Sequence, residues 1–113
     1  MPAQSWWQEI DAAVTVCDPQ GIILEMNEKA VRTYAADGGR SLMGKSFWDC
    51  HPEPAREKIR RIMETRTSNC YTIEKSGLKK MIYQTPWYEE GTYRGLVEIS
   101  MVIPGTMPHF IRK

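Results

Sequence analysis

The stretch Trp48–Glu57, WDCHPEPARE, holds the residues of this sequence that are best suited to chemistry. Asp49, Cys50 and His51 supply a carboxylate, a thiol and an imidazole, the groups that serve nucleophilic catalysis and metal binding. Consecutive residues rarely converge on one reacting atom, because a nucleophile and its base usually come from distant parts of a chain. Alternatively, Asp49 or His51 caps a helix whose first turn contains the two prolines. We therefore expect a helix start beside a pocket, where Cys50 or His51 contacts a ligand, and no catalytic residue.

The remaining thiols and imidazole do not complete a metal site. Zinc requires three or four nitrogen or sulfur ligands at suitable spacing, and the second histidine, His109, lies near the C-terminus. The three cysteines are widely separated without a C-x-x-C pair, which argues against a zinc cage or a disulfide scaffold. We expect Cys17 and Cys70 to be small buried residues, and the pattern is typical of a reducing, cytoplasmic location.

Length and composition limit the classes of function. The 113 residues suffice for one domain with a single core. Fifteen basic and 14 acidic residues nearly cancel, which leaves no overall electrostatic footprint for nucleic acid. No apolar run approaches the roughly 20 residues of a membrane span, and the N-terminus lacks a secretory signal pattern. These properties indicate a globular domain that binds neither nucleic acid nor a membrane.

The spacing of apolar residues predicts an α+β fold. A turn, DPQG, joins two β-rich runs into a hairpin, and Asn27 is placed to cap the helix that follows. After Thr67 the apolar period drops from 3.6 to 2, which indicates strands. The predicted elements, in order two strands, several short helices and three strands, cover residues 12–17, 22–27, 28–36, 40–50, 52–66, 68–75, 78–88 and 93–103. This order predicts one five-stranded antiparallel sheet with short helices packed on one face.

The predicted domain has short additions at both ends. Residues 1–10 contain SWWQEI, which predicts a helical cap or dimerisation segment with Ser5 as its N-cap. Residues 11–103 hold the predicted sheet and helices. Residues 104–113 contain two prolines and no regular pattern, which indicates a tail or the stub of a linker.

The order and motifs of the chain resemble those of a PAS domain over roughly residues 8–103. The resemblance is carried by VTVCDPQGIILEMNEKAV, LMGKSFWDCHPEPARE and YQTPWYEEGTYRGLVEIS. It implies a PAS-like single domain that serves as a cytosolic, non-catalytic sensor or interaction module of bacterial-type signal transduction. Such a module binds a small ligand or a partner protein. We expect a homodimer formed through the N-terminal segment and the sheet face, with the effector domain or partner outside this chain.

The resemblance also bears on the cofactor, which it leaves unknown. Flavin-binding light-oxygen-voltage domains carry the photoreactive cysteine three residues after a glycine, in G-R-N-C-R-F-L-Q. Here Phe47 occupies that place after Gly44, Cys50 comes three residues too late, and Val97 replaces a glutamine. Flavin is therefore disfavoured. Haem-binding oxygen sensors carry their proximal histidine just after P-E-P, where this chain has none. Haem is disfavoured as well, although His51 leaves it open.

Strand alternation and the PAS pattern predict which side chains face the pocket. Ile82 and Gln84 are expected to point inward. On the last strand we expect Val97 and Ile99 to point inward, and Glu98 therefore to point outward. The candidate ligand-binding residues are Tyr34, Phe47, Cys50, His51, Ile59, Met63, Ile82, Gln84, Val97 and Ile99. This lining suits a small, partly apolar ligand, unless these side chains simply fill the core.

Two further hypotheses come from other classes of protein. One is a haem protein that uses His51. The other is a small cone-shaped isomerase of the ketosteroid-isomerase type, which needs an inward carboxylate as base and a hydrogen-bond donor opposite it. The outward orientation expected for Glu74 and Glu98 argues against this enzyme, as does the hairpin that precedes the helices.

Overall fold

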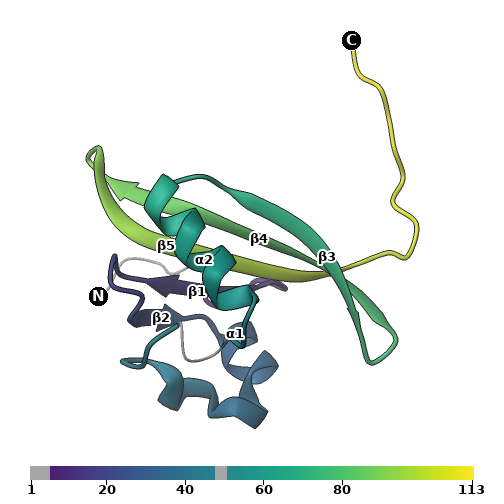
Figure 1. The fold of residues 1–113 in the computed structure, drawn as a ribbon. Helices are drawn as coiled ribbons and strands as arrows, with labels where there is room; N and C mark the ends of the chain where they lie inside the picture. The colour runs from purple at the N-terminus through teal and green to yellow at the C-terminus, as the bar shows by residue number, and fades with distance from the viewer. Residues whose placement is uncertain (1–5, 48–50) are drawn as a thin grey trace.

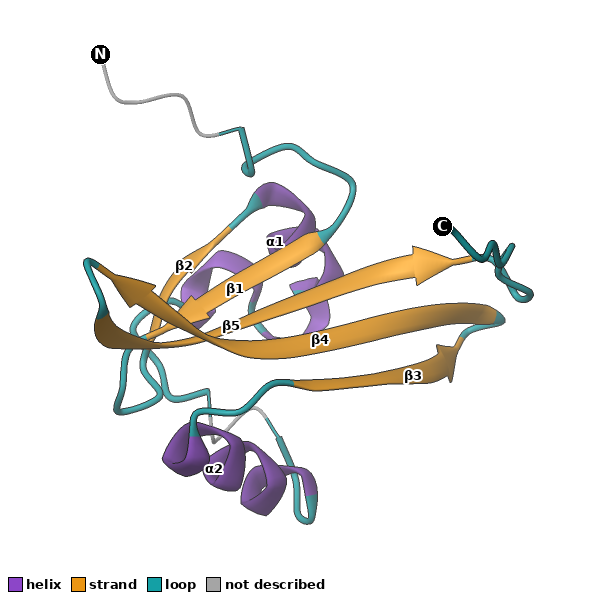
Figure 2. Ribbon diagram, turned by 90° about the horizontal axis from the view of Figure 1, so that it is seen from above, coloured by secondary structure: helices purple, strands orange, loops and turns teal. Residues whose placement is uncertain are grey.

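The computed structural model describes residues 6–47 and 51–113, and these residues form one antiparallel sheet with helices on one side (Figures 1 and 2). The five strands lie in the order β2-β1-β5-β4-β3. The strands are β1 (Ala13–Cys17), β2 (Ile23–Met26), β3 (Asn69–Lys75), β4 (Leu78–Glu89) and β5 (Thr92–Ile103). The helices are α1 (Glu28–Thr33) and α2 (Ala55–Thr65), with the 3-10 turns η1 (Ala35–Asp37) and η2 (Gly39–Leu42) between them. The predicted α+β class and sheet are confirmed, and every strand ends within one residue of its predicted bounds.

The hairpin of β1 and β2 is closed by side-chain bonds to the backbone. One carboxylate oxygen of Asp18 accepts hydrogen bonds from the N–H groups of Gln20 and Ile22, both at 2.9 Å. Gly21 follows at a φ of 84°, a conformation that costs glycine little. The DPQG turn therefore forms as predicted, from interactions within five residues.

Asn27 joins the hairpin, the first helix and the N-terminal segment. Its side chain is fully buried. The Oδ1 atom accepts from the N–H groups of Val14 and Ala30, both at 2.9 Å, and so caps α1. The Nδ2 atom donates to the carbonyls of Trp7 and Ala12, both at 2.8 Å. All of the hydrogen-bonding capacity of this amide is used, which makes its burial favourable.

The N-terminal segment differs from its prediction. Residues 6–10 form turns and bends, so the predicted short helix is wrong over this range, whereas Ser5 lies outside the described residues. The carbonyl of Trp7 accepts from Asn27, and the carbonyl of Gln8 accepts from the N–H of Glu28 at 3.0 Å. These tertiary bonds use the carbonyls that a helix would need for its own ladder.

The middle of the chain also begins its helix later than predicted. Ser46 pairs with Ile22 in an isolated β-bridge, so residues 45–47 form no helical turn. The long helix starts at Ala55, with Pro54 at its N-cap position and no capping side chain. Of the two predicted cap residues, Asp49 lies outside the described residues. His51 bonds to the carbonyl of Phe47 and does not cap the helix.

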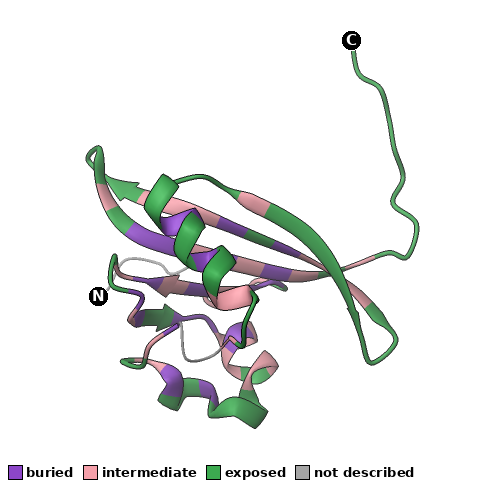
Figure 3. Ribbon diagram, in the orientation of Figure 1, coloured by how far each residue is buried: buried purple, intermediate pink, exposed green. Residues whose placement is uncertain are grey.

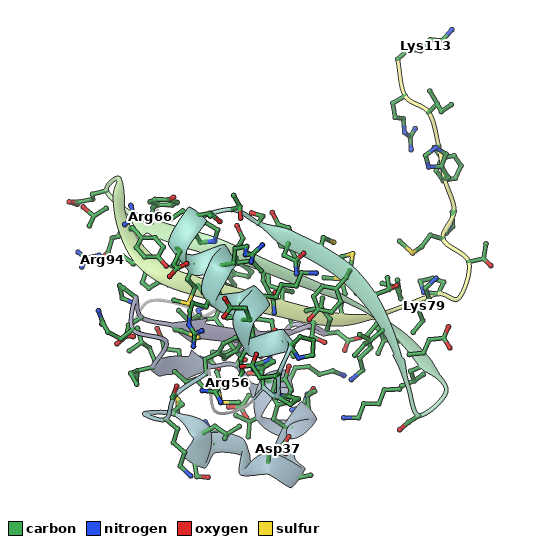
Figure 4. All side chains as sticks on the ribbon, viewed as in Figure 1. Asp37, Arg56, Arg66, Lys79, Arg94 and Lys113 are labelled. Atoms are coloured by element: carbon green, nitrogen blue, oxygen red, sulfur yellow. The ribbon has the colours of Figure 1, made fainter. Side chains whose placement is uncertain are left out.

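The core lies between the sheet and the helices. Helix α2 turns the stripe Ile59, Ile62 and Met63 toward the sheet, and Figure 3 shows buried segments on this helix where it crosses in front of the strands. At the C-terminal end of α2, the Arg66 guanidinium stacks over the Tyr93 ring at 4.2 Å (Figure 4). Cys17 is buried as predicted, but Cys70 is exposed, because it lies on the outer side of the edge strand β3, which no element covers. None of the described helices is long and apolar enough to cross a membrane.

Candidate functional site

A cavity of about 500 Å³ lies between the inner face of the sheet and the segment from α1 to His51. The strands β1, β2 and β5 line one side, and η1, η2 and residues 45–47 line the other. Four apolar side chains contribute to its wall, and Thr15, Tyr34, His51 and Glu98 are among the polar groups that face it. The apolar side chains are Ile23, Met26, Leu42 and Phe47. The lining combines these four apolar side chains with seven polar or charged residues, so a small molecule there would meet both kinds of surface.

Strand register brings Glu98 to the inner face of the sheet. Glu98 on β5 pairs with Thr15 on β1 and with Gln84 on β4, so the three side chains form a row across the sheet. Glu98 is 6% exposed and Gln84 is 2% exposed. The expected inward orientation of Gln84 is therefore observed, but the outward orientation expected for Glu98 is wrong.

A one-residue bulge between β4 and β5 explains this difference. Near the turn Tyr88 pairs with Tyr93, but Trp87 pairs with Gly95, so Arg94 is an extra residue on β5. If the first register continued, Gln84 would pair with Val97. The extra residue moves Glu98 into that place, because a shift of one residue exchanges the two faces of a strand.

Glu98 is held at the cavity by two donors. Tyr34 Oη donates to Oε1 at 3.1 Å, and Gln84 Nε2 donates to Oε2 at 2.7 Å. Asn69 Nδ2 in turn donates to Gln84 Oε1 at 3.2 Å, which fixes the orientation of the glutamine amide. Every hydrogen bond in this network is donated toward the carboxylate, so each oxygen of Glu98 has a donor.

His51 faces the same carboxylate. Its Nδ1 atom lies 3.0 Å from the carbonyl oxygen of Phe47, which can only accept, so Nδ1 carries a proton. Nε2 is then the atom that faces Glu98 Oε2, at 4.0 Å. The imidazole also contacts the Phe47 ring, with centroids 4.5 Å apart. The tautomer and the orientation of His51 are thus both set by Phe47.

Comparison with known proteins identifies the family. A family model described as the PAS fold matches residues 7–69, more than half of the chain. The chain is a member of the PAS-fold family. No curated protein sequence is a significant match to this PAS domain.

Solved structures show the same fold at low sequence identity. The PAS domain of the histidine kinase ThkA superposes with a TM-score of 0.66 at 14% identity, covering 81% of this chain and 99% of that one. The PAS domain of BvgS from Bordetella pertussis gives 0.62 at 15% identity, with 86% and 80% covered. The Aer2 receptor from Vibrio cholerae, described as a dual PAS-haem oxygen sensor, gives 0.61 at 19% identity, with 82% and 95% covered.

The structure brings together only part of the predicted site of this PAS domain. Tyr34, Phe47 and His51 line the cavity, and Gln84 reaches it through Glu98. Cys50 lies outside the described residues. The residues Ile59, Met63 and Ile82 are buried but do not line this cavity. Whether any of these side chains contacts a ligand remains a prediction.

Two predicted residues lie on the wrong face for this cavity. Val97 and Ile99 are half-buried on the outer face of the sheet, where they pair with Val16 and Val14 of β1. Sequence reasoning missed eight of the eleven described residues that line this cavity: Thr15, Ile23, Met26, Asp37, Leu42, Lys45, Ser46 and Glu98. The sequence carries one signal of the bulge in β5. Gly95 lies in a long hairpin, and a glycine within a strand often marks a bulge.

A second cavity, of about 360 Å³, lies between α2 and the strands β3 and β4. Gln84 contributes to its wall, so the network from Asn69 to Glu98 separates it from the first cavity. Burial, and then the nearby negative charge of Glu98, raise the pKa of Tyr71 above its usual value of 10.0. The negative charge of Glu98 therefore affects the pKa of Tyr71 in the second cavity.

Proposed function

We propose that this PAS domain is a non-catalytic sensory module that binds a small ligand in the cavity at Glu98. The module would pass the change in occupancy to a partner protein or an effector domain. The observation that supports this proposal is the buried, hydrogen-bonded carboxylate of Glu98 in the wall of a cavity that four apolar side chains also line. Burial of a charge costs free energy that an apolar residue would avoid, so a fold that needed only a packed core would gain nothing from it.

The geometry favours binding over catalysis. An isomerase of the type considered above needs a carboxylate base and a donor on opposite sides of its substrate. Glu98 does point inward, but Tyr34 donates directly to it, and its other oxygen accepts from Gln84. A base whose oxygens both accept hydrogen bonds is a weak proton acceptor, and Tyr34 is not placed to polarise a substrate.

Haem does not fit the residues at this site. With Nδ1 engaged by Phe47, an iron would have to bind His51 at Nε2. Only 4.0 Å separates Nε2 from Glu98 Oε2, and a macrocycle around the iron would overlap the carboxylate. A haem-binding function through His51 is therefore disfavoured by geometry as well as by sequence.

The proposal includes a homodimer formed through the N-terminal segment and the outer face of the sheet. Trp6 is 76% exposed, and a band of half-exposed apolar side chains covers the outer face. The band consists of Val14, Val16, Val97, Ile99 and Met101. Apolar area of this kind is commonly covered by a partner, here a second copy of the chain. The two described cysteines are free thiols, and a cytoplasmic location is part of the proposal.

Native mass spectrometry of freshly purified protein, with an absorption spectrum beside it, tests this function. We expect a small bound mass that is released on denaturation, and no Soret band. A Soret band abolished by His51→Ala would replace the proposal with a haem sensor. Absence of any bound mass, together with no change in the NMR signals of cavity residues across a fragment library, would contradict ligand binding.

A further inference from the structure

We infer that the cavity at Glu98 selects a small organic cation, a protonated amine or aminoheterocycle attached to an apolar body. This inference rests on the proposed function, namely that the cavity binds a ligand. It is carried by the acceptor groups that face the cavity, by its net charge and by the chemistry of its wall.

The acceptors of the site are arranged for a ligand that donates. Each oxygen of Glu98 accepts one bond from the protein, from Tyr34 or Gln84, and a carboxylate oxygen has room for a second donor. Because Nδ1 of His51 donates to the Phe47 carbonyl, a neutral imidazole has its lone pair on Nε2, the atom that faces Glu98.

The distance between these two acceptors suits one bridging nitrogen. Glu98 Oε2 and His51 Nε2 are 4.0 Å apart, too far for a direct hydrogen bond. An ammonium nitrogen about 2.9 Å from each atom would donate to both, at an ordinary hydrogen-bond length. A ligand with only acceptor atoms would add a third lone pair to the same place.

The charged residues of the site also indicate a cationic ligand. Its charged lining residues are Asp37, Lys45 and Glu98. Asp37 and Lys45 are exposed and of opposite sign, and Figure 4 shows Asp37 in the helical segment below the sheet. Glu98 is buried, so its negative charge is poorly screened and dominates inside the cavity. A cation is attracted to this position and an anion is repelled.

The wall determines the rest of the ligand. Ile23, Met26, Leu42 and Phe47 are apolar and are positioned to contact a carbon skeleton. A volume of about 500 Å³ accommodates a bicyclic ring with a short side chain. We therefore expect a compact amine with an aromatic or aliphatic body.

Three compounds with one ring system and different head groups test this inference: tryptamine, tryptophol and indole-3-acetate, which are cationic, neutral and anionic. Their dissociation constants are measured by isothermal titration calorimetry with the purified wild-type chain. We expect tryptamine to bind about ten- to a hundredfold more tightly than tryptophol, because its ammonium group adds the attraction of opposite charges to its hydrogen bonds with Glu98. Indole-3-acetate should bind most weakly.

Substitution of the carboxylate assigns the preference to Glu98. Glu98→Gln keeps the shape and removes the charge, so it should bring tryptamine and tryptophol to nearly equal affinity. Glu64→Gln, an exposed residue on α2, is the matched control and should retain the wild-type preference. If Glu98→Gln does not fold, the wild-type series decides the question by itself.

The outcomes separate this inference from the proposed function. Equal binding of the three compounds, or tighter binding of indole-3-acetate, would overturn selection for a cation and leave ligand binding intact. Binding of neutral fragments from the library with no binding of tryptamine would have the same consequence. A cavity that binds none of the three compounds and no fragment would overturn both.

Discussion

At the scale of single residues, Glu98 determines the character of the site. Its carboxylate is buried, accepts bonds from Tyr34 and Gln84, and lies 4.0 Å from His51 Nε2. A buried charge persists in a fold only when its hydrogen bonds are made, and here both oxygens have a donor. The same negative charge contributes to the raised pKa of Tyr71, which lines the second cavity.

The influence of Glu98 on Tyr71 gives a measurable prediction. Glu98→Gln should move the pKa of Tyr71 down toward 10.0 without reaching it, because burial is the larger cause of the shift and the charge of Glu98 is the smaller one. NMR titration of the Cζ carbon of labelled tyrosine measures this pKa. Glu64→Gln should leave it unchanged, and an unaltered Tyr71 in Glu98→Gln would contradict the coupling.

The raised pKa of Tyr71 also predicts how stability depends on pH. The folded protein holds the phenolic proton more tightly than the unfolded chain does. This contribution is complete below pH 10 or so and is lost as the pH rises through the folded pKa. Urea denaturation from pH 8 to 11 should therefore show a smaller loss of stability in Tyr71→Phe than in the wild type. An identical pH profile for both proteins would exclude this contribution.

At the scale of elements, two residues, Asn27 and Gly95, determine how the strands are placed. Asn27 joins the first hairpin to α1 and to the N-terminal segment through four hydrogen bonds. Gly95 follows the bulge on β5, at a φ of 131°, and lets this strand approach β1. A Cβ atom at this position would overlap the carbonyl of Cys17. Each of these is a single residue, but most of the contacts described for it are with residues far away in the sequence.

Loss of the Asn27 amide should destabilise the fold strongly. Asn27→Ala removes a helix cap and leaves buried backbone groups of Val14 and Ala12 without partners. We expect the free energy of unfolding to fall by about 2–4 kcal/mol, measured by urea denaturation. Ser41→Ala removes a bond between an exposed hydroxyl and the Gly38 carbonyl, and should cost less than about 0.5 kcal/mol. Equal effects of the two substitutions would argue against the role of Asn27.

Gly95 should tolerate no side chain. Gly95→Ala places a methyl group against the β1 backbone at a φ that alanine rarely adopts. We expect a loss of at least about 2 kcal/mol in the free energy of unfolding. Gly105→Ala is the control, because a Cβ there has open space around it and should leave stability nearly unchanged. A stable Gly95→Ala variant would mean that β1 and β5 can separate without cost.

At the scale of the whole molecule, the two faces of the sheet differ in what covers them. The inner face is covered by the helices and borders the cavities. The outer face carries the half-exposed apolar band, and Trp6 in the N-terminal segment is exposed. A ligand inside and a second copy outside would contact opposite sides of the same strands. A change in β5 on binding would therefore be felt directly at the dimer interface.

The proposed dimer predicts a mass of twice 13.1 kDa in sedimentation velocity experiments. Ile99→Glu introduces a charge into the outer apolar band, and Trp6→Ala removes exposed aromatic area. Each should raise the dissociation constant of the dimer by about tenfold or more. Ile73→Glu is the matched control, because Ile73 is an exposed apolar residue of β3 outside the band. A wild-type chain that remains monomeric at high concentration would exclude the dimer.

Much of this architecture could be predicted because its causes are local. The DPQG turn closes through Asp18 and Gly21, Asn27 caps the next helix, and alternation marks each strand to within one residue. These features depend on interactions between neighbours in the sequence, so the order of elements and the sheet followed from the sequence. The inward positions expected for Tyr34, Phe47, His51 and Gln84 came from the resemblance to PAS domains, which supplied the choice of face that alternation leaves open.

The orientation of β5 was decided only by the tertiary structure. Alternation states that Val97 and Glu98 face opposite sides, but not which of them faces inward. That choice depends on one extra residue, Arg94, at a bulge formed by pairing with β4, and its effect is to exchange the two faces. The sequence by itself determined the elements and the family pattern, because local sterics and periodicity suffice for them. The pairing of distant strands placed a carboxylate in the cavity where an apolar residue was expected, because register is a property of two strands together.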